Sequence, residues 1–235
     1  MKEGGPIDLE YYADIYFGGK KPENITIYFL RQNEYKKKYQ ELSKKIFGAS
    51  DNEYKDTLGY YIYDKKDDSY HVLIRDCGIG FENVYIMNLY HELSHVITIP
   101  KRTGASLYCS SSKKDSDAVI GYQFWVEYIA HYEAINRYLM TIGDIEFLKD
   151  RDTVKRKLTK LMPQYDEFLY EIVLYSEMTD VYIDGTEDET KSLIQILRHV
   201  KNRFVSKDDI CSISKKELKD IGKSVWKLFS KIRDL

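Results

Sequence analysis

The stretch of this chain best suited to chemistry is His91-Glu92-Leu93-Ser94-His95. Two histidines four positions apart on a helix are rotated by about 400°, so both imidazoles project from one face and could bind one metal ion. Zn²⁺ is the expected ion for this spacing. Glu92 lies on the flank of the same face, where the general base for a metal-bound water belongs. The pattern therefore predicts a hydrolytic zinc site that needs one more protein ligand.

A second helix, expected from about residue 116 to 140, offers that ligand. It is mostly apolar and aromatic, which predicts burial, and it contains Glu127 and His131 four positions apart. Because a buried carboxylate needs a partner, we favour Glu127 as the third ligand. His131 lies on the same face one turn later, and it could instead bind the metal, hydrogen-bond a ligand or face the reacting group. The structural alternative is a buried Glu127–His131 pair.

The elements that position these residues follow from the spacing of apolar side chains. We expect a buried strand at 25–30 and an amphipathic helix at 32–47 that ends before Gly48. Two strands joined by a polar loop should follow at 58–63 and 70–75. A glycine-rich connector at 76–80 then leads into the motif helix, expected at 81–97 and ended by Pro100. Asn88 should share the metal face of that helix.

The second half of the chain has helical periodicity almost throughout. A polar segment at 101–115 predicts a surface loop, and the acidic stretch at 180–189 predicts a turn. The expected helices of this half lie at 154–161, 165–178, 193–204 and 215–232. The fold class is therefore α+β: a small mixed sheet with its two site helices in a catalytic region at 1–145, followed by a helical subdomain at 146–235. The two parts could equally form one domain.

The composition bears on the cellular location of the protein and on the kinds of partner it could bind. Lys and Arg number 36 against 38 Asp and Glu, for a formal net charge of −2, so neither nucleic acid nor an anionic membrane is predicted as a partner. The chain lacks an apolar leader-like segment and a membrane-spanning run, which favours a cytoplasmic location. Cys77, Cys109 and Cys211 are odd in number and scattered, which argues against disulfides or a cysteine zinc site.

The motif and the later Glu127 carry a family resemblance. His-Glu-x-x-His on one helix, followed after a loop by a helix with a ligand glutamate, resembles the gluzincin branch of the zincin metallopeptidases. The preceding strand, helix, strand, strand order is similar to the N-terminal half of a minimal zincin, in which an edge strand lines the cleft above the motif helix. The resemblance covers residues 25 to about 140. It implies that His91, His95 and Glu127 bind Zn²⁺ and that Glu92 is the general base of a metallopeptidase acting on a peptide or protein.

The resemblance also has departures. Many gluzincins have an aspartate four residues after the ligand glutamate, where this chain has His131, and no Gly-x-x-His of the metzincin branch follows His95. A weaker similarity, in size and setting, is to the ImmA/IrrE-like intracellular peptidases. No motif identifies the residue that stabilises the oxyanion. Its candidates are Tyr122, Tyr128, Tyr132, His131 and His199.

The competing functional hypothesis is a non-catalytic regulatory or interaction protein. Such a protein would keep the zincin fold and its zinc site and would work by binding a partner in a phage, toxin-antitoxin or stress-response setting. The presence of Glu92 favours the enzyme, because a protein that only binds has no need of a general base. The sequence indicates neither the substrate specificity nor the oligomeric state.

Overall fold

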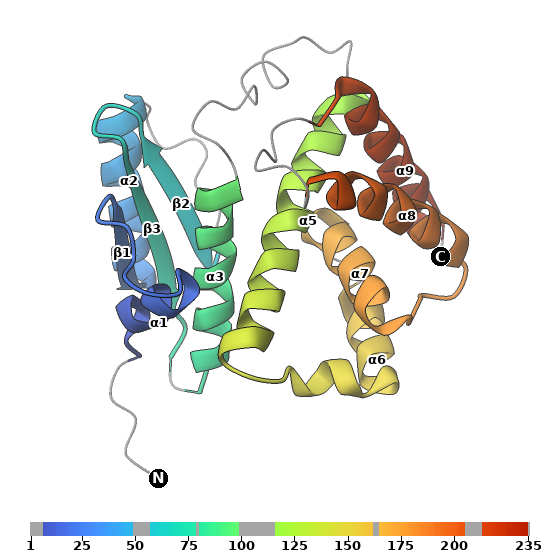
Figure 1. Ribbon diagram of the computed structural model, residues 1–235, viewed down its shortest axis with the longest axis horizontal. Helices are drawn as coiled ribbons and strands as arrows, with labels where there is room; N and C mark the ends of the chain where they lie inside the picture. The colour runs from blue at the N-terminus through green and yellow to red at the C-terminus, as the bar shows by residue number, and fades with distance from the viewer. Residues whose placement is uncertain are drawn as a thin grey trace. The chain divides into compact units, whose positions relative to one another are not determined.

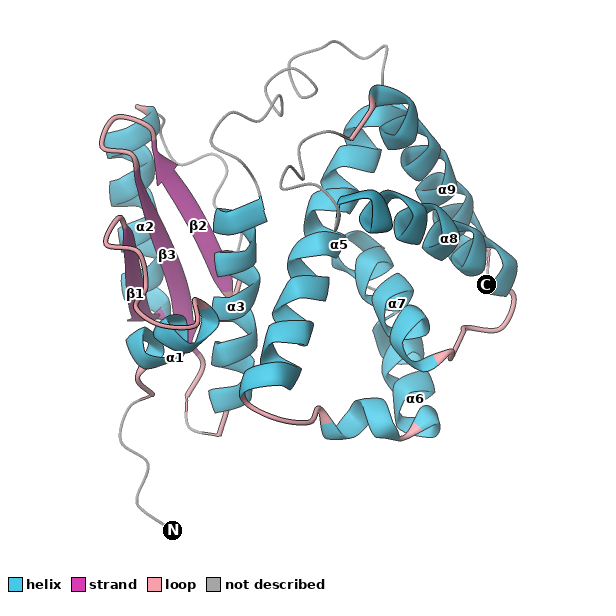
Figure 2. Ribbon diagram, in the orientation of Figure 1, coloured by secondary structure: helices cyan, strands magenta, loops and turns pink. Residues whose placement is uncertain are grey.

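The computed structural model describes residues 7–48, 57–78, 80–98, 116–161, 165–204 and 213–234. These residues form a mixed α+β fold, which confirms the expected class (Figures 1 and 2). Contacts divide the chain into two compact units. The first comprises residues 1–97 and 133–143, and the second comprises 98–132 and 144–235. The break after Gly143 lies next to the boundary expected at 145, whereas 98–132 group with the C-terminal helices.

The first unit contains a sheet whose described strands lie in the order β1-β3-β2. β1 pairs with β3 in parallel, from Ile25 opposite Tyr70 to Arg31 opposite Asp76. β2 pairs with β3 antiparallel through a polar turn after Asp64, as the alternating runs predicted. β2 is therefore an edge strand of the described sheet. The strands are β1 Ile25–Arg31, β2 Gly59–Asp64 and β3 Ser69–Asp76.

One face of this sheet is covered by α2, Gln32–Phe47, whose bounds match the predicted helix. The helix ends at Gly48, which adopts a left-handed conformation (φ 65°) that glycine accommodates without a Cβ clash. Its apolar stripe packs on the α2-facing side chains of β2 and β3. The buried core of this layer comprises Tyr35, Tyr39, Leu42, Ile62 and Leu73.

The other face of the sheet carries the motif helix α3, Glu82–Thr98, and the short helix α1, Leu9–Tyr16 (Figure 1). Phe29 of β1 packs edge-on against Tyr85 of α3, with ring centroids 5.0 Å apart. The Tyr85 hydroxyl also accepts a hydrogen bond from the Cys77 backbone at 2.8 Å and lies 2.6 Å from the Gly78 carbonyl. Because this hydroxyl binds the glycine-rich connector, the start of α3 is fixed to the end of β3.

The second unit is helical. α5, Ser116–Thr141, is one continuous helix that belongs to both units, because its residues from 133 onward group with the first. The acidic stretch expected to be a turn is partly helical: α8 begins at Glu187, since acidic side chains in a first turn are stabilised by the positive end of the helix dipole. The remaining elements are a 3-10 turn Glu146–Lys149, α6 Arg151–Leu161, α7 Tyr165–Thr179, α8 Glu187–Phe204 and α9 Lys215–Arg233.

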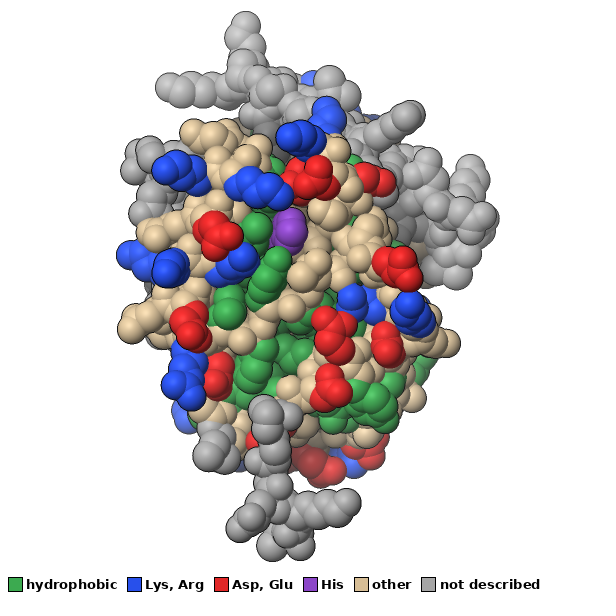
Figure 3. All heavy atoms as spheres, turned by 90° about the vertical axis from the view of Figure 1, so that its left-hand side faces the viewer, with side chains coloured by type: hydrophobic (Ala, Val, Ile, Leu, Met, Phe, Trp, Pro, Cys, Tyr) green, Lys and Arg blue, Asp and Glu red, His purple; other side chains and the backbone are tan. Residues whose placement is uncertain are grey.

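The described surface carries both signs of charge. On the face shown in Figure 3, acidic and basic side chains are interspersed around apolar patches, so no field of a single sign dominates there. Among the described helices, none is long and apolar enough to span a membrane. The polar segment at 101–115, predicted as a loop, lies outside the described residues.

Candidate metal centre

The two motif histidines converge on one face of α3. The Nε2 atoms of His91 and His95 lie 2.9 Å apart, and the ring planes are nearly perpendicular at 89°. His95 is buried, with 4% exposure, and His91 is half-buried. Zinc binds imidazole nitrogen at about 2.0–2.1 Å, so one ion can contact two nitrogens that are less than about 4 Å apart. The two nitrogens are also within hydrogen-bonding distance of each other, and their shared position on one helix face agrees with the spacing of the motif.

Glu92 is buried beside this pair, with 7% exposure. Its carboxylate lies against Gly59 of β2, where a Cβ built on the glycine would come 2.7 Å from Oε1. The motif thus presents a carboxylate and two imidazoles from consecutive turns of one helix, in an environment shielded from water. In such an environment, interactions between these groups are stronger than in water.

The opposite side of the motif is held by hydroxyl groups. The Ser94 hydroxyl donates to the Tyr90 carbonyl at 2.7 Å and lies 3.0 Å from the Tyr16 hydroxyl of α1. Burial raises the pKa of Tyr16 to about 12, opposed by its hydrogen bond with Ser94. The Tyr90 hydroxyl lies 3.2 Å from Oγ1 of Thr141, at the end of α5. These contacts fix the rotation of α3 about its axis, which determines where the histidines point.

Asn88 is half-buried on α3, and its side-chain amide donates to the Val84 carbonyl of the same helix at 2.9 Å. This local bond holds the amide close to the backbone of its own helix. Ile97 is 50% exposed, because it lies in the last turn of α3, one residue before the helix ends.

Glu127 and His131 lie on one face of α5, toward α7. His131 stacks on Tyr170 of α7, with centroids 4.5 Å apart and planes at 23°. Glu127 and Tyr170 both line a pocket of about 280 Å³ in the second unit, whose walls include Phe124 and Trp226. His91, Glu127 and His131 are each half-buried, and each offers a ligand atom of a kind that could hold a metal ion.

Tyr128, one of the candidate oxyanion donors, follows Glu127 directly on α5 and contacts α7 at a different residue. Its hydroxyl donates to Glu177 of α7, and Glu177 also pairs with Arg198 at 3.0 Å and with Lys201 at 3.2 Å. Burial, together with the Glu177 charge and hydrogen bond, raises the pKa of Tyr128 well above its ordinary value. Lys201 lies over the Tyr132 ring, 3.6 Å from its centroid. This network joins α5, α7 and α8 and has a structural role.

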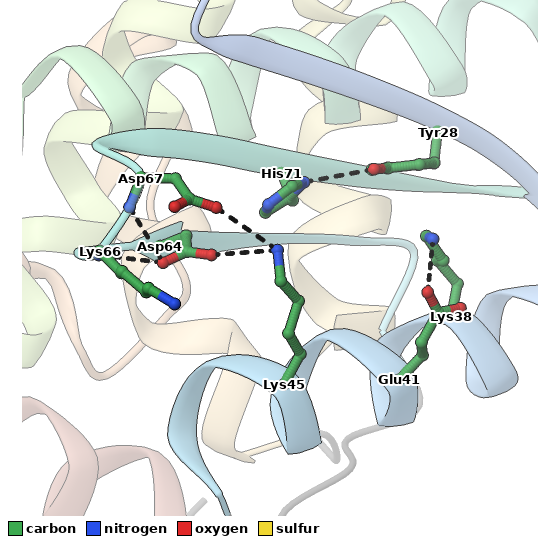
Figure 4. A network of polar contacts seen from close by, with 8 residues as sticks. All are labelled: Tyr28, Lys38, Glu41, Lys45, Asp64, Lys66, Asp67 and His71. Carbon is green, nitrogen blue, oxygen red and sulfur yellow. Dashed lines mark hydrogen bonds and ion pairs between the residues drawn. The ribbon is translucent and has the colours of Figure 1, made fainter.

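A further histidine, His71 of β3, lies on the α2 side of the sheet (Figure 4). Its Nδ1 is 3.3 Å from the Tyr28 hydroxyl, and its Nε2 is buried without a hydrogen-bond partner among the described residues. Lys45 reaches across to Asp64 and Asp67 nearby, at 3.5 Å in each case. Desolvation, reinforced by the Lys45 charge, lowers the pKa of His71.

Two residues of β2 that touch the motif were not identified from the sequence. Gly59 contacts Glu92, and Tyr61 stacks on His95 with centroids 5.2 Å apart and planes at 21°. Both lie in a run correctly predicted as a strand. Their role depends on which helix that strand faces, and the alternation of side chains does not carry this information.

Comparison of the chain with protein-family models, with curated proteins and with solved structures found no match.

Proposed function

We propose that this protein is a zinc-dependent peptidase, in which His91, His95 and Glu127 bind the metal and Glu92 is the general base. The observation that carries the proposal is the convergence of the two motif imidazoles, with Nε2 atoms 2.9 Å apart. The burial of Glu92 on the same helix supports its role, because a buried carboxylate near neutral pH is an effective base.

The third ligand is proposed from α5. Residues 133–143 belong to the first unit together with α3, and Thr141 lies 3.2 Å from Tyr90 there. Glu127 precedes this segment on the same unbroken helix, which supports Glu127 as the third zinc ligand. His131 remains the alternative ligand, since it shares a helix face with Glu127 and stacks on Tyr170, which lines the same pocket as Glu127.

The chemistry follows from these roles. Zinc would polarise a substrate carbonyl and lower the pKa of a water toward about 7. Glu92 would take the proton from the attacking water and deliver it to the leaving amine as the peptide C–N bond breaks. Among the candidates for stabilising the oxyanion, Tyr128 is disfavoured because its hydroxyl proton is already donated to Glu177. His131, on the same helix face as Glu127, is the better candidate if it does not bind the metal.

The arrangement of the first unit supports a zincin-like fold within the α+β class. β2 is an antiparallel edge strand of the described sheet, and it contacts the motif helix through Gly59 and Tyr61. An edge strand beside the motif helix is what the gluzincin resemblance implies. By the same resemblance the substrate is a peptide or protein, and the weaker similarity to the ImmA/IrrE-like peptidases would place it inside the cell.

The substitution Glu92→Gln tests the proposal. It removes the base but keeps the size of the side chain, so the variant should bind one equivalent of zinc and lose at least about 100-fold in kcat, within the range that general acid-base catalysis contributes. The measurement is cleavage of a fluorogenic peptide library by zinc-loaded protein, with a chelator as control and zinc content determined in parallel.

Full activity of the zinc-loaded Glu92→Gln variant would refute the assignment of the base. A wild-type protein that binds zinc and cleaves no peptide or protein would instead favour the regulatory, non-catalytic function.

A further inference from the structure

The edge strand β2 approaches Glu92 more closely than a strand with a side chain could. A Cβ on Gly59 would lie 2.7 Å from Oε1 of Glu92, 2.9 Å from its Cγ and 3.2 Å from its Cδ. Such separations are shorter than the van der Waals contact of carbon with these atoms, so any other residue would displace the carboxylate. Gly59 is itself buried, as is Glu92.

The next residue on the same face of β2 contacts the other end of the motif. Tyr61 stacks on the His95 ring, with centroids 5.2 Å apart and planes at 21°. Gly59 pairs with Ile74 and Tyr61 with Val72, so both positions are fixed by the ladder between β2 and β3. Ile74 and Val72 are fully buried, with 0% exposure, which makes a shift of this register costly.

We propose that β2 positions the metal motif through these two residues, an inference that rests on the proposed function. Gly59 determines where the Glu92 carboxylate lies, because a Cβ at this position would overlap it. Tyr61 determines the plane of the His95 ring, and hence the direction of its Nε2. Neither residue touches the substrate in this scheme. Both act through a motif residue and are positioning residues.

The Gly59 contact can be tested on the metal-free chain by a double-mutant cycle. Gly59→Ala should lower the urea midpoint of unfolding when Glu92 is present. In a Glu92→Ala background, where the clashing atoms are absent, the same change should have a markedly smaller effect. Gly19→Ala is the control, because a Cβ at Gly19 meets no atom within 4 Å. Equal effects of Gly59→Ala in the two backgrounds would overturn the role of Gly59.

The Tyr61 contact is tested by zinc affinity, measured by competition with a chromophoric chelator. Tyr61→Leu should weaken zinc binding about tenfold, as loss of groups that orient a ligand usually does, whereas Tyr61→Phe keeps the stacked ring and should restore affinity. Tyr63→Leu, two residues further on the strand, removes an aromatic ring that packs on Tyr70 instead and should leave zinc affinity unchanged. Wild-type affinity in Tyr61→Leu would overturn the role of Tyr61.

Peptidase activity is a third measurement, and it distinguishes a failure of the positioning roles from a failure of the proposed function. Gly59→Ala should lower kcat while KM and zinc affinity stay unchanged, because it displaces the base and leaves the ligands in place. If wild-type protein binds zinc but cleaves nothing, the peptidase assignment fails. The unfolding cycle and the zinc affinities still test whether Gly59 and Tyr61 position the motif. If wild-type protein binds no zinc, the assigned role of Tyr61 fails together with the proposed function.

Discussion

Among single residues, side chains of the same type have different roles because their surroundings differ. Glu177 is nearly buried and pairs with Arg198 and Lys201, which neutralise its charge and make it a structural group. Glu92 is buried too, but it lies on the motif helix against a glycine. The histidines divide in the same way: His95 stacks on Tyr61 within the motif, whereas His71 lies on the other face of the sheet, outside it.

His71 predicts a pH dependence of stability. Its folded pKa is lowered, so below about pH 6.5 the unfolded chain binds a proton that the folded chain does not. This proton uptake stabilises the unfolded state, and the protein should lose stability as the pH falls from 7.5 to 5.5. In His71→Gln, which does not titrate, the loss over this interval should be smaller. Urea unfolding at both pH values measures it, and an equal loss in wild type and variant would contradict the prediction.

At the scale of elements, the second unit depends on a close crossing of two helices. A Cβ on Gly121 of α5 would lie 1.8 Å from the Leu218 carbonyl oxygen of α9, and a Cβ on Gly222 would lie 1.9 Å from the Asp117 carbonyl oxygen. Each helix therefore contributes a glycine to the point where the other backbone approaches. The absence of a side chain at these two positions allows the backbones of α5 and α9 to approach this closely.

Gly121→Ala should destabilise the protein by about 3 kcal/mol, the upper end of the usual range for overpacking, because the atom that the new methyl meets is backbone and cannot turn away. Ser230→Ala, an exposed position on α9, is the matched control and should change stability by less than about 0.5 kcal/mol. Thermal and urea unfolding followed by circular dichroism measure both. A Gly121→Ala protein as stable as wild type would show that the two helices are not this close.

At the scale of the whole molecule, α5 is the element common to both units. Its residues from 133 onward group with the sheet and the motif helix, and its earlier residues group with the C-terminal helices. A zinc ion bound by the two motif histidines and Glu127, as proposed, would make the stability of the protein depend on metal.

Zinc at 100 times its dissociation constant should stabilise the protein by about 2.7 kcal/mol, and a chelator should reverse the gain. Glu127→Gln should weaken zinc binding and reduce this stabilisation, whereas Gln123→Ala, one turn earlier on α5, should not. Calorimetric titration and thermal unfolding provide the measurements. If His131→Gln abolishes the gain and Glu127→Gln does not, the third ligand is His131.

Local signals in the sequence predicted most of the helices and strands and the residues of the motif. Local periodicity and terminator residues predicted α2 to the residue, with Gly48 at its end, and placed the three strands, α3 and α5 within a few residues, because these signals act over one or two turns. They also predicted that His91 and His95 share a helix face. The acidic residues at the start of α8 were misassigned because a turn and a helix N-terminus favour the same side chains.

The residues that lie against the motif are set by the packing of the sheet on α3. The parallel pairing of β1 with β3 makes β2 an edge strand, and the register of β2 brings Gly59 to Glu92 and Tyr61 to His95. Strand alternation leaves open which sheet face meets which helix, because that choice depends on burying both faces at once. The partner of Tyr128 was equally hidden in the sequence, since Glu177 lies 49 residues away along the chain and only helix packing brings its carboxylate to the hydroxyl.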